Sequence, residues 1–158
     1  MEIIKQDILD IHKGVIVHGC NCSGGFASGV AGQIRQRIPK VYERYIDLMG
    51  NATITNPYDQ WLGYIQVVEI TPELYIINGF TQIYYGRNKG TKYAHPKAID
   101  NVMYKAACFA IGQGLDLYAP LIGCGLGGLS WEEEVKGIYC EIQLLLNDNQ
   151  RKLVVCNV

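Results

Sequence analysis

VIVHGCNCSGGFASGVA, residues 15–31, is the stretch of sequence that decides the fold. Its first residues, Val15–Val17, are continuously apolar, which is typical of a strand that is covered on both faces. Apolar residues then recur at every fourth position over Val30–Ile38, which is the spacing of a helix. The stretch therefore predicts a buried strand, a glycine-rich loop and a helix that begins near Gly29.

This loop has the features of a phosphate-binding site. Glycines let the main chain approach a phosphate closely, and the unpaired amides at a helix N-terminus supply donors and a favourable dipole for a negative group. The alternative is that Gly24, Gly25 and Gly29 only allow a tight turn between the strand and the helix.

A second glycine-rich loop, LIGCGLGGL at residues 121–129, lies between a predicted strand that ends at Ala119 and a predicted helix that begins at Ser130. Its glycines fit the spacing G-x-G-x-x-G, but that motif indicates a dinucleotide-binding fold only when an acidic residue ends the next strand. Here Asp148 precedes the last strand. Two such loops in one chain favour a ligand with more than one phosphate, or one diphosphate that is held from both sides.

Strands and helices alternate along the rest of the chain. Apolar runs predict strands at Ile3–Lys5, Val15–His18, Tyr64–Ile70, Leu74–Asn78, Leu115–Ala119 and Leu153–Cys156. We expect helices over residues 29–50 with a restart at Pro39, after Pro96, and from Ser130, where Ser130 and Glu133 match a capping box. This pattern predicts an α/β fold with a mixed, mostly parallel sheet between helices.

The composition narrows the possible functions. The chain has 158 residues, 49% of them hydrophobic, with a net charge of -1 and a pI near 6.3, so no strong field would draw it onto a membrane or nucleic acid. We expect no membrane partner, and nucleic acid is disfavoured although 11 tyrosines could stack on bases. The six cysteines lack C-x-x-C spacing, so we expect no metal. We also expect no cofactor. The absence of a signal or membrane segment predicts a cytoplasmic protein.

With both loops in place, the chain resembles the macrodomain family, whose members recognise ADP-ribose. The segment IKQDI at 4–8 is similar to the family's V-x-G-D-I start, with Gln6 in place of the usual glycine. HGCNC at 18–22, followed by Gly29–Ala31, is similar to its first loop. IGCGL at 122–126 and the following tryptophan are similar to the second loop of the short, stand-alone subgroup that includes ADP-ribose-1''-phosphate phosphatases.

The resemblance covers nearly the whole chain. It implies a single macrodomain over residues 1–158 with a three-layer α/β/α fold. It also implies that Asp7 bonds the adenine amine beside the Ile8 amide, and that Asn21 faces the distal ribose. The diphosphate would lie between two segments, one made of Ser28, Gly29, Val30 and Ala31 and the other of Ile122, Gly123, Cys124, Gly125, Leu126 and Gly127.

The subgroup match predicts a phosphatase that uses water to hydrolyse ADP-ribose-1''-phosphate to ADP-ribose and phosphate. Arg87 and either Lys89 or Lys92, in the aromatic and basic segment 80–93, could neutralise the terminal phosphate, although such a segment is also typical of a solvated loop. Asn21 and His18 are the candidate catalytic residues. His18 is the candidate acid or base, because imidazole titrates near neutral pH and the residue lies at the end of a strand beside Asn21. A histidine within a strand is, alternatively, a structural group.

Two other functions stay open. The chain could be a binding module for ADP-ribose or a related nucleotide signal, or it could remove ADP-ribose from proteins or nucleic acid. The branch of the family that removes ADP-ribose from glutamate places a lysine after the middle strand and an aspartate in the second loop. Here the corresponding residues are Gln82 and Gly127, so that version of the activity is not expected.

Overall fold

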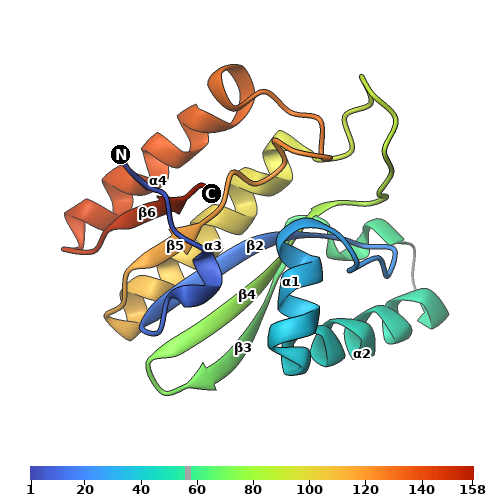
Figure 1. The fold of residues 1–158 in the computed structure, drawn as a ribbon, viewed down its shortest axis with the longest axis horizontal. Helices are drawn as coiled ribbons and strands as arrows, with labels where there is room; N and C mark the ends of the chain where they lie inside the picture. The colour runs from blue at the N-terminus through green and yellow to red at the C-terminus, as the bar shows by residue number, and fades with distance from the viewer. Residues whose placement is uncertain (56–57) are drawn as a thin grey trace.

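The computed structural model describes residues 1–55 and 58–158 (Figure 1). The strands of this part of the chain are β1 (Glu2–Ile4), β2 (Gly14–Asn21), β3 (Ile65–Thr71), β4 (Leu74–Gln82), β5 (Leu117–Ala119) and β6 (Leu153–Cys156). They form one six-stranded sheet in the order β1-β6-β5-β2-β4-β3 within the described residues. All neighbouring strands are parallel except β3, which is antiparallel to β4. The predicted mixed, mostly parallel sheet is confirmed.

Helices cover both faces of the sheet (Figure 1). Helices α1 (Gly29–Arg37) and α2 (Pro39–Thr55) lie on one face, and α3 (Pro96–Gln113) and α4 (Lys136–Asp148) lie on the other. Shorter turns are η1 (Ile8–Asp10), η2 (Tyr58–Trp61) and η3 (Trp131–Val135), the last being π-helical. The arrangement has three layers, α/β/α, as the sequence predicts.

Strand β2 shows why the sheet is covered on both sides. Val15 and Val17 pack into the apolar cluster under α3 and α4, while Ile16 packs into the cluster under α1 and α2. All three side chains are buried, because alternate residues of a strand point to opposite faces. The continuous apolar run of the sequence is therefore confirmed as a central strand.

One helix is longer than predicted. The expected restart at Pro39 is present, because α1 ends at Arg37 and α2 begins at Pro39. Gly50 does not end α2, which continues to Thr55. A glycine inside a helix costs only about 1 kcal/mol relative to alanine. Burial of Val41, Tyr45 and Met49 on one face of α2 offsets that cost.

The start of the last helix also differs from the prediction in one residue. The hydroxyl of Ser130 accepts a hydrogen bond from the Glu133 amide (3.2 Å), as expected of a capping box. The Ser130 amide, however, donates to the carboxylate of Glu134 (2.8 Å) and not to Glu133. The first turn is π-helical and holds more residues than an α-helical turn, so the side chain one position later reaches the cap.

Candidate functional site

Three segments of the chain enclose a cavity of about 420 Å³. They follow β2, β4 and β5, which are parallel neighbours, so their carboxyl ends meet at one end of the sheet (Figure 1). We call them the first loop (residues 22–28), the β4–α3 segment (residues 83–95) and the second loop (residues 120–130). The cavity lining consists of residues 18–21, 25–31, 81–82, 85–87, 120–123 and 125–127. Two glycine loops far apart in the sequence thus line one cavity.

Asn21 shapes the first loop. Its side-chain oxygen accepts hydrogen bonds from the amides of Ser23 (3.1 Å) and Gly25 (3.0 Å) and from the Ser23 hydroxyl (3.3 Å). Its side-chain nitrogen donates to the Gly25 carbonyl (2.6 Å). Asn21 also lines the cavity, so the same side chain that folds the loop borders the space for a ligand. Its contact with a ribose stays a prediction.

A buried tyrosine hydroxyl bonds to the main chain of each loop. Tyr45, on α2, accepts from the Gly24 amide (3.1 Å) and lies 2.9 Å from the Asn21 carbonyl oxygen. Tyr139, on α4, accepts from the Ile122 amide (3.1 Å) and donates to the Pro120 carbonyl (2.5 Å). The two helices approach from opposite faces of the sheet, so each loop is tied to a different layer.

Main chain forms much of the wall that the second loop gives to the cavity. A Cβ atom at Gly127 would lie 2.7 Å from the Gly123 carbonyl oxygen, which real Cβ atoms do not tolerate. Gly123 has a φ of 79°, a conformation that favours glycine. The Gly123 carbonyl accepts from the Leu129 amide (2.9 Å), which closes the loop on itself. A side chain at Gly127 would therefore require a shift of this backbone.

Two groups of main-chain amides, in separate segments of the cavity lining, donate to no other group within residues 1–55 and 58–158. One group is at the first turn of α1, where a helix offers no internal acceptor. The other lies in the second loop. Their members are Gly29, Val30 and Ala31, and Gly123, Gly125, Leu126 and Gly127, all of which line the cavity. These amides can bind an anion from two sides.

The β4–α3 segment connects the two loops. Next to β4, the carbonyls of Gln82 and Ile83 accept from the Cys22 amide (3.0 and 3.1 Å). Near α3, the amides of Tyr93 and Ala94 donate to the Gly127 carbonyl (2.8 and 3.1 Å). The segment and the adjacent end of β4 are therefore hydrogen-bonded to both glycine loops.

The same segment packs on one loop and forms an ion pair beside the other. The ring of Tyr85 packs so closely on Gly25 that a Cβ there would lie 2.5 Å from it. The Lys92 ammonium pairs with the carboxylate of Glu134, so this lysine is held outside the cavity lining.

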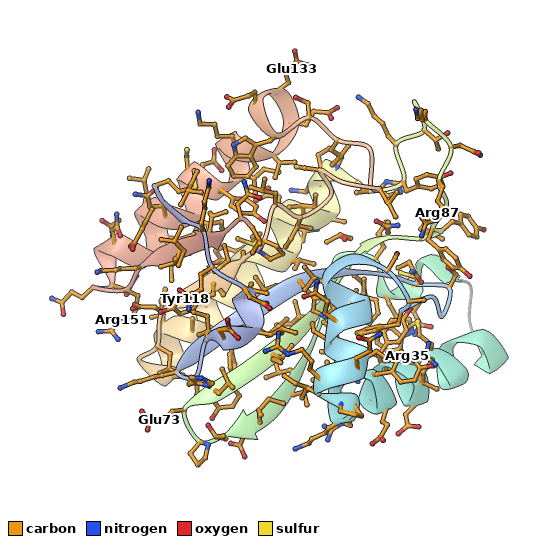
Figure 2. The ribbon with its side chains drawn as sticks, in the orientation of Figure 1. Arg35, Glu73, Arg87, Tyr118, Glu133 and Arg151 are labelled. Carbon is orange, nitrogen blue, oxygen red and sulfur yellow. The ribbon has the colours of Figure 1, made fainter. Side chains whose placement is uncertain are left out.

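Arg87 is the one lining residue with a full charge in the described part of the chain. Figure 2 shows it on the segment between β4 and α3, at the same end of the molecule as the first loop. Its guanidinium is exposed and forms no ion pair with the residues that the structure describes. It is available to an anionic group at this side of the cavity.

His18 lies at the floor of the cavity and is 1% exposed. Its Nε2 lies 2.6 Å from the Asn78 side-chain oxygen. The Asn78 nitrogen donates to the side-chain oxygen of Gln66 (3.0 Å), so the Asn78 oxygen accepts and His18 Nε2 carries the proton. Burial lowers the pKa of His18 to about 4, opposed in part by the bond to Asn78. At neutral pH the imidazole is therefore uncharged and a weak base.

Cys20, His18 and Asn78 have the residue types of a thiol nucleophile with its base. The sulfur of Cys20 is 3.6 Å from His18 Nε2 and 3.9 Å from Nδ1, and Nε2 is also the atom that bonds Asn78. Burial raises the pKa of Cys20 well above its ordinary value, whereas a nucleophilic thiolate needs a lowered one. The cluster is therefore not arranged for covalent catalysis.

Three predicted site residues lie outside the cavity lining: Asp7, Ile8 and Cys124. Asp7 accepts from the Leu9 amide (2.9 Å) at the start of η1 and pairs with Arg37 (2.7 Å). Ile8 is buried beside it. The thiol of Cys124 donates to the Ile122 carbonyl (3.5 Å), and burial raises its pKa to about 11. The remaining predicted residues, His18, Asn21, Ser28–Ala31, Arg87, Ile122, Gly123 and Gly125–Gly127, all line the cavity.

Metal-ligating side chains do not gather in the part of the chain that the structure describes: no three His, Cys, Asp or Glu residues there could hold one ion. Within the same residues, no helix has the length and apolar content needed to cross a bilayer.

Comparison with known proteins shows which family the chain belongs to. No protein-family model matches the chain. A 17.5 kDa protein of bacteriophage T4, from the tk–vs intergenic region, is 31% identical over 138 residues, which cover 84% of this chain and 83% of the phage protein. This chain belongs to the family of that phage protein.

Solved structures identify the fold. A Bacteroides thetaiotaomicron protein of unknown function is 27% identical, with a TM-score of 0.79 over 99% of this chain and 97% of that one. The macrodomain of Thermus aquaticus DarG is 20% identical, with a TM-score of 0.78 over 99% and 97% of the two chains. Thermosipho africanus DarTG in complex with ADP-ribose is 17% identical, with a TM-score of 0.75 over 98% of this chain and 40% of that one. The chain has the macrodomain fold.

Sequence reasoning missed several residues that build the candidate site. Tyr45 and Tyr139 occupy the apolar stripes of their helices, so periodicity assigns them to the core and says nothing of their hydroxyls. A signal was available, because a fully buried tyrosine usually finds a hydrogen-bond partner for its hydroxyl. Asn78 and Tyr85 gave no such signal, since their partners, His18 and Gly25, lie about 60 residues away in the sequence.

Proposed function

We propose that this macrodomain, acting as one domain over residues 1–158, binds ADP-ribose in the cavity between its two glycine loops. The observation that carries the proposal is that two groups of amides, at the first turn of α1 and in the second loop, line one cavity and lack acceptors within the described residues. A diphosphate offers oxygens in both directions and would satisfy both groups. A protein with the same fold is known in complex with ADP-ribose.

The assignment of the rest of the ligand follows the family resemblance. Asn21 would face the distal ribose with the side-chain proton that its loop does not use. Asp7 would bond the adenine amine beside the Ile8 amide. Because Arg37 already pairs with the Asp7 carboxylate, Asp7 would accept the adenine amine through its remaining lone pairs.

We further propose that the substrate is ADP-ribose-1''-phosphate, which water hydrolyses to ADP-ribose and phosphate. The phosphorus–oxygen bond to the ribose breaks as the water oxygen attacks, and the water proton passes to the leaving oxygen. The transition state of phosphoryl transfer is loose, so charge stabilisation and positioning matter more than a strong base. Arg87 would stabilise the charge on the terminal phosphate.

A specific observation favours a second candidate, which is binding without turnover. His18 is the titratable side chain nearest to the role of a base, but its pKa near 4 makes it a weak acceptor of protons. Asn21 cannot serve as the base either, because a side-chain amide does not take up a proton near neutral pH and its oxygen already accepts bonds from the first loop. In this case the macrodomain would hold ADP-ribose or a related nucleotide as a signal.

Release of ADP-ribose from modified macromolecules is the third function to test. For the version that needs a lysine and an aspartate, the matching residues argue against it. Gln82 donates to the Tyr84 carbonyl (2.8 Å), and Gly127 has no room for a side chain.

Binding titrations, together with two activity assays, separate these three functions. Calorimetry with ADP-ribose, ADP-ribose-1''-phosphate and AMP measures affinity, and phosphate release is followed in the presence of a chelator. We expect ADP-ribose to bind more tightly than AMP, which has one phosphate, and phosphate release to persist without metal. Binding without release would select the second candidate, and loss of label from an ADP-ribosylated acceptor would select the third. No binding of any of these ligands would refute the proposal.

A further inference from the structure

The ring of Tyr45 is held firmly below the first loop. It is 0% exposed and packs against Phe26, with ring centroids 4.7 Å apart, and parallel to Phe80 at 6.1 Å. Its hydroxyl accepts from the Gly24 amide and lies 2.9 Å from both the main-chain and the side-chain oxygen of Asn21. The Tyr45 hydroxyl is thus the acceptor for the Gly24 amide, in place of a backbone carbonyl of the loop.

Tyr139 repeats this arrangement on the other face of the sheet. It is 0% exposed and packs edge-on against Trp131, with ring centroids 4.9 Å apart. Its hydroxyl bonds the Pro120 carbonyl and the Ile122 amide, which also lies 3.0 Å from that carbonyl. Burial raises the pKa of both tyrosines, so each hydroxyl keeps the proton that it donates.

We infer that Tyr45 and Tyr139 are positioning residues that hold the two loops in the shape that grips a diphosphate. The inference rests on the proposed binding of ADP-ribose. A loop fixed before binding loses less conformational freedom when the ligand arrives, and this preorganisation raises affinity. Each hydroxyl bonds the part of its loop next to the strand, and the amides that lack acceptors follow it in the chain.

The test replaces each tyrosine by phenylalanine, which keeps the packed ring and removes the hydroxyl. We expect Tyr45→Phe and Tyr139→Phe each to weaken ADP-ribose binding roughly tenfold, and the double variant to combine both losses, because the hydroxyls act on separate walls. Tyr75→Phe is the matched control. Its hydroxyl bonds the side chains of Glu69 (3.2 Å) and Gln113 (3.4 Å), away from the cavity.

Affinity is measured well below the melting temperature of each variant, so a change in stability alone does not alter it. If both variants bind ADP-ribose within twofold of the wild type, the hydroxyls serve stability alone and the inference is wrong. If the wild type itself does not bind, the proposed function fails, and the positioning role has no ligand to act on.

Amide hydrogen exchange tests the same idea without any variant. In the free wild-type protein we expect the amides of Gly24 and Ile122 to be protected, and those of Gly125–Gly127 to exchange quickly until ADP-ribose is added. Rapid exchange of Gly24 and Ile122 in the free protein would contradict a preformed loop. This measurement also decides the matter if a phenylalanine variant does not fold.

Discussion

Acid should destabilise this protein through His18, and the size of the effect follows from the burial of its ring. The imidazole has a pKa of about 4 in the folded protein and 6.5 as its ordinary value. Below pH 6.5 the unfolded chain binds a proton at His18 that the folded protein does not bind. The free energy of unfolding therefore falls as pH falls from 6.5 to about 4. The full difference corresponds to about 3 kcal/mol, and about 2 kcal/mol of it falls between pH 7 and pH 5.

Urea unfolding, followed by the fluorescence of Trp61 and Trp131, measures this loss at several pH values. The variant His18→Gln keeps a donor for Asn78 but cannot bind the proton, so its unfolding free energy should fall by about 2 kcal/mol less than that of the wild type between pH 7 and pH 5. His95→Gln, at an exposed histidine, is the matched control for losing one histidine. If wild type and His18→Gln have the same acid dependence, the imidazole is not buried uncharged and the reasoning is refuted.

Three further substitutions test other features. Arg87→Gln should weaken binding of ADP-ribose-1''-phosphate about fivefold, since an exposed charge contact contributes up to about 1 kcal/mol. The same variant should change the affinity for ADP-ribose less than twofold. Lys89→Gln, outside the cavity lining, is the control for both calorimetric titrations. Gly127→Ala should weaken ADP-ribose binding roughly tenfold or more because its Cβ would meet the Gly123 carbonyl, whereas Gly137→Ala, in open space on α4, should leave binding unchanged. Ser130→Ala should lower the free energy of unfolding by about 1 kcal/mol, because the Glu133 amide loses its cap.

The sequence predicts the sheet and the two loops well, because both depend on local patterns. A continuous apolar run such as Val15–Val17 is typical of a strand covered on two faces, and the first turn of a helix leaves amides without acceptors. These are properties of short segments and of their order along the chain. The two loops lie together because β2 and β5 are parallel neighbours, and that strand order comes from the structure.

The chemistry within the site could not be predicted in the same way. An exposed His18 could act as a base, whereas a buried His18 that is hydrogen-bonded to Asn78 is a structural group. The sequence does not reveal this partner, because Asn78 lies in another strand. In the π-helical turn at Trp131–Val135, the carboxylate that accepts from the Ser130 amide belongs to Glu134 and not to Glu133. No residue pattern predicts the extra residue in that turn. Such details depend on contacts between distant segments.

The separation of the apolar interior into two clusters affects how this protein can change over generations. Tyr45 belongs to the cluster under α1 and α2, and Tyr139 to the cluster under α3 and α4, with the sheet between them. A substitution that repacks one cluster reaches one wall of the cavity and leaves the other wall in place. Mutations can therefore adapt one half of the pocket to a new ligand group while the opposite half preserves what it already recognises.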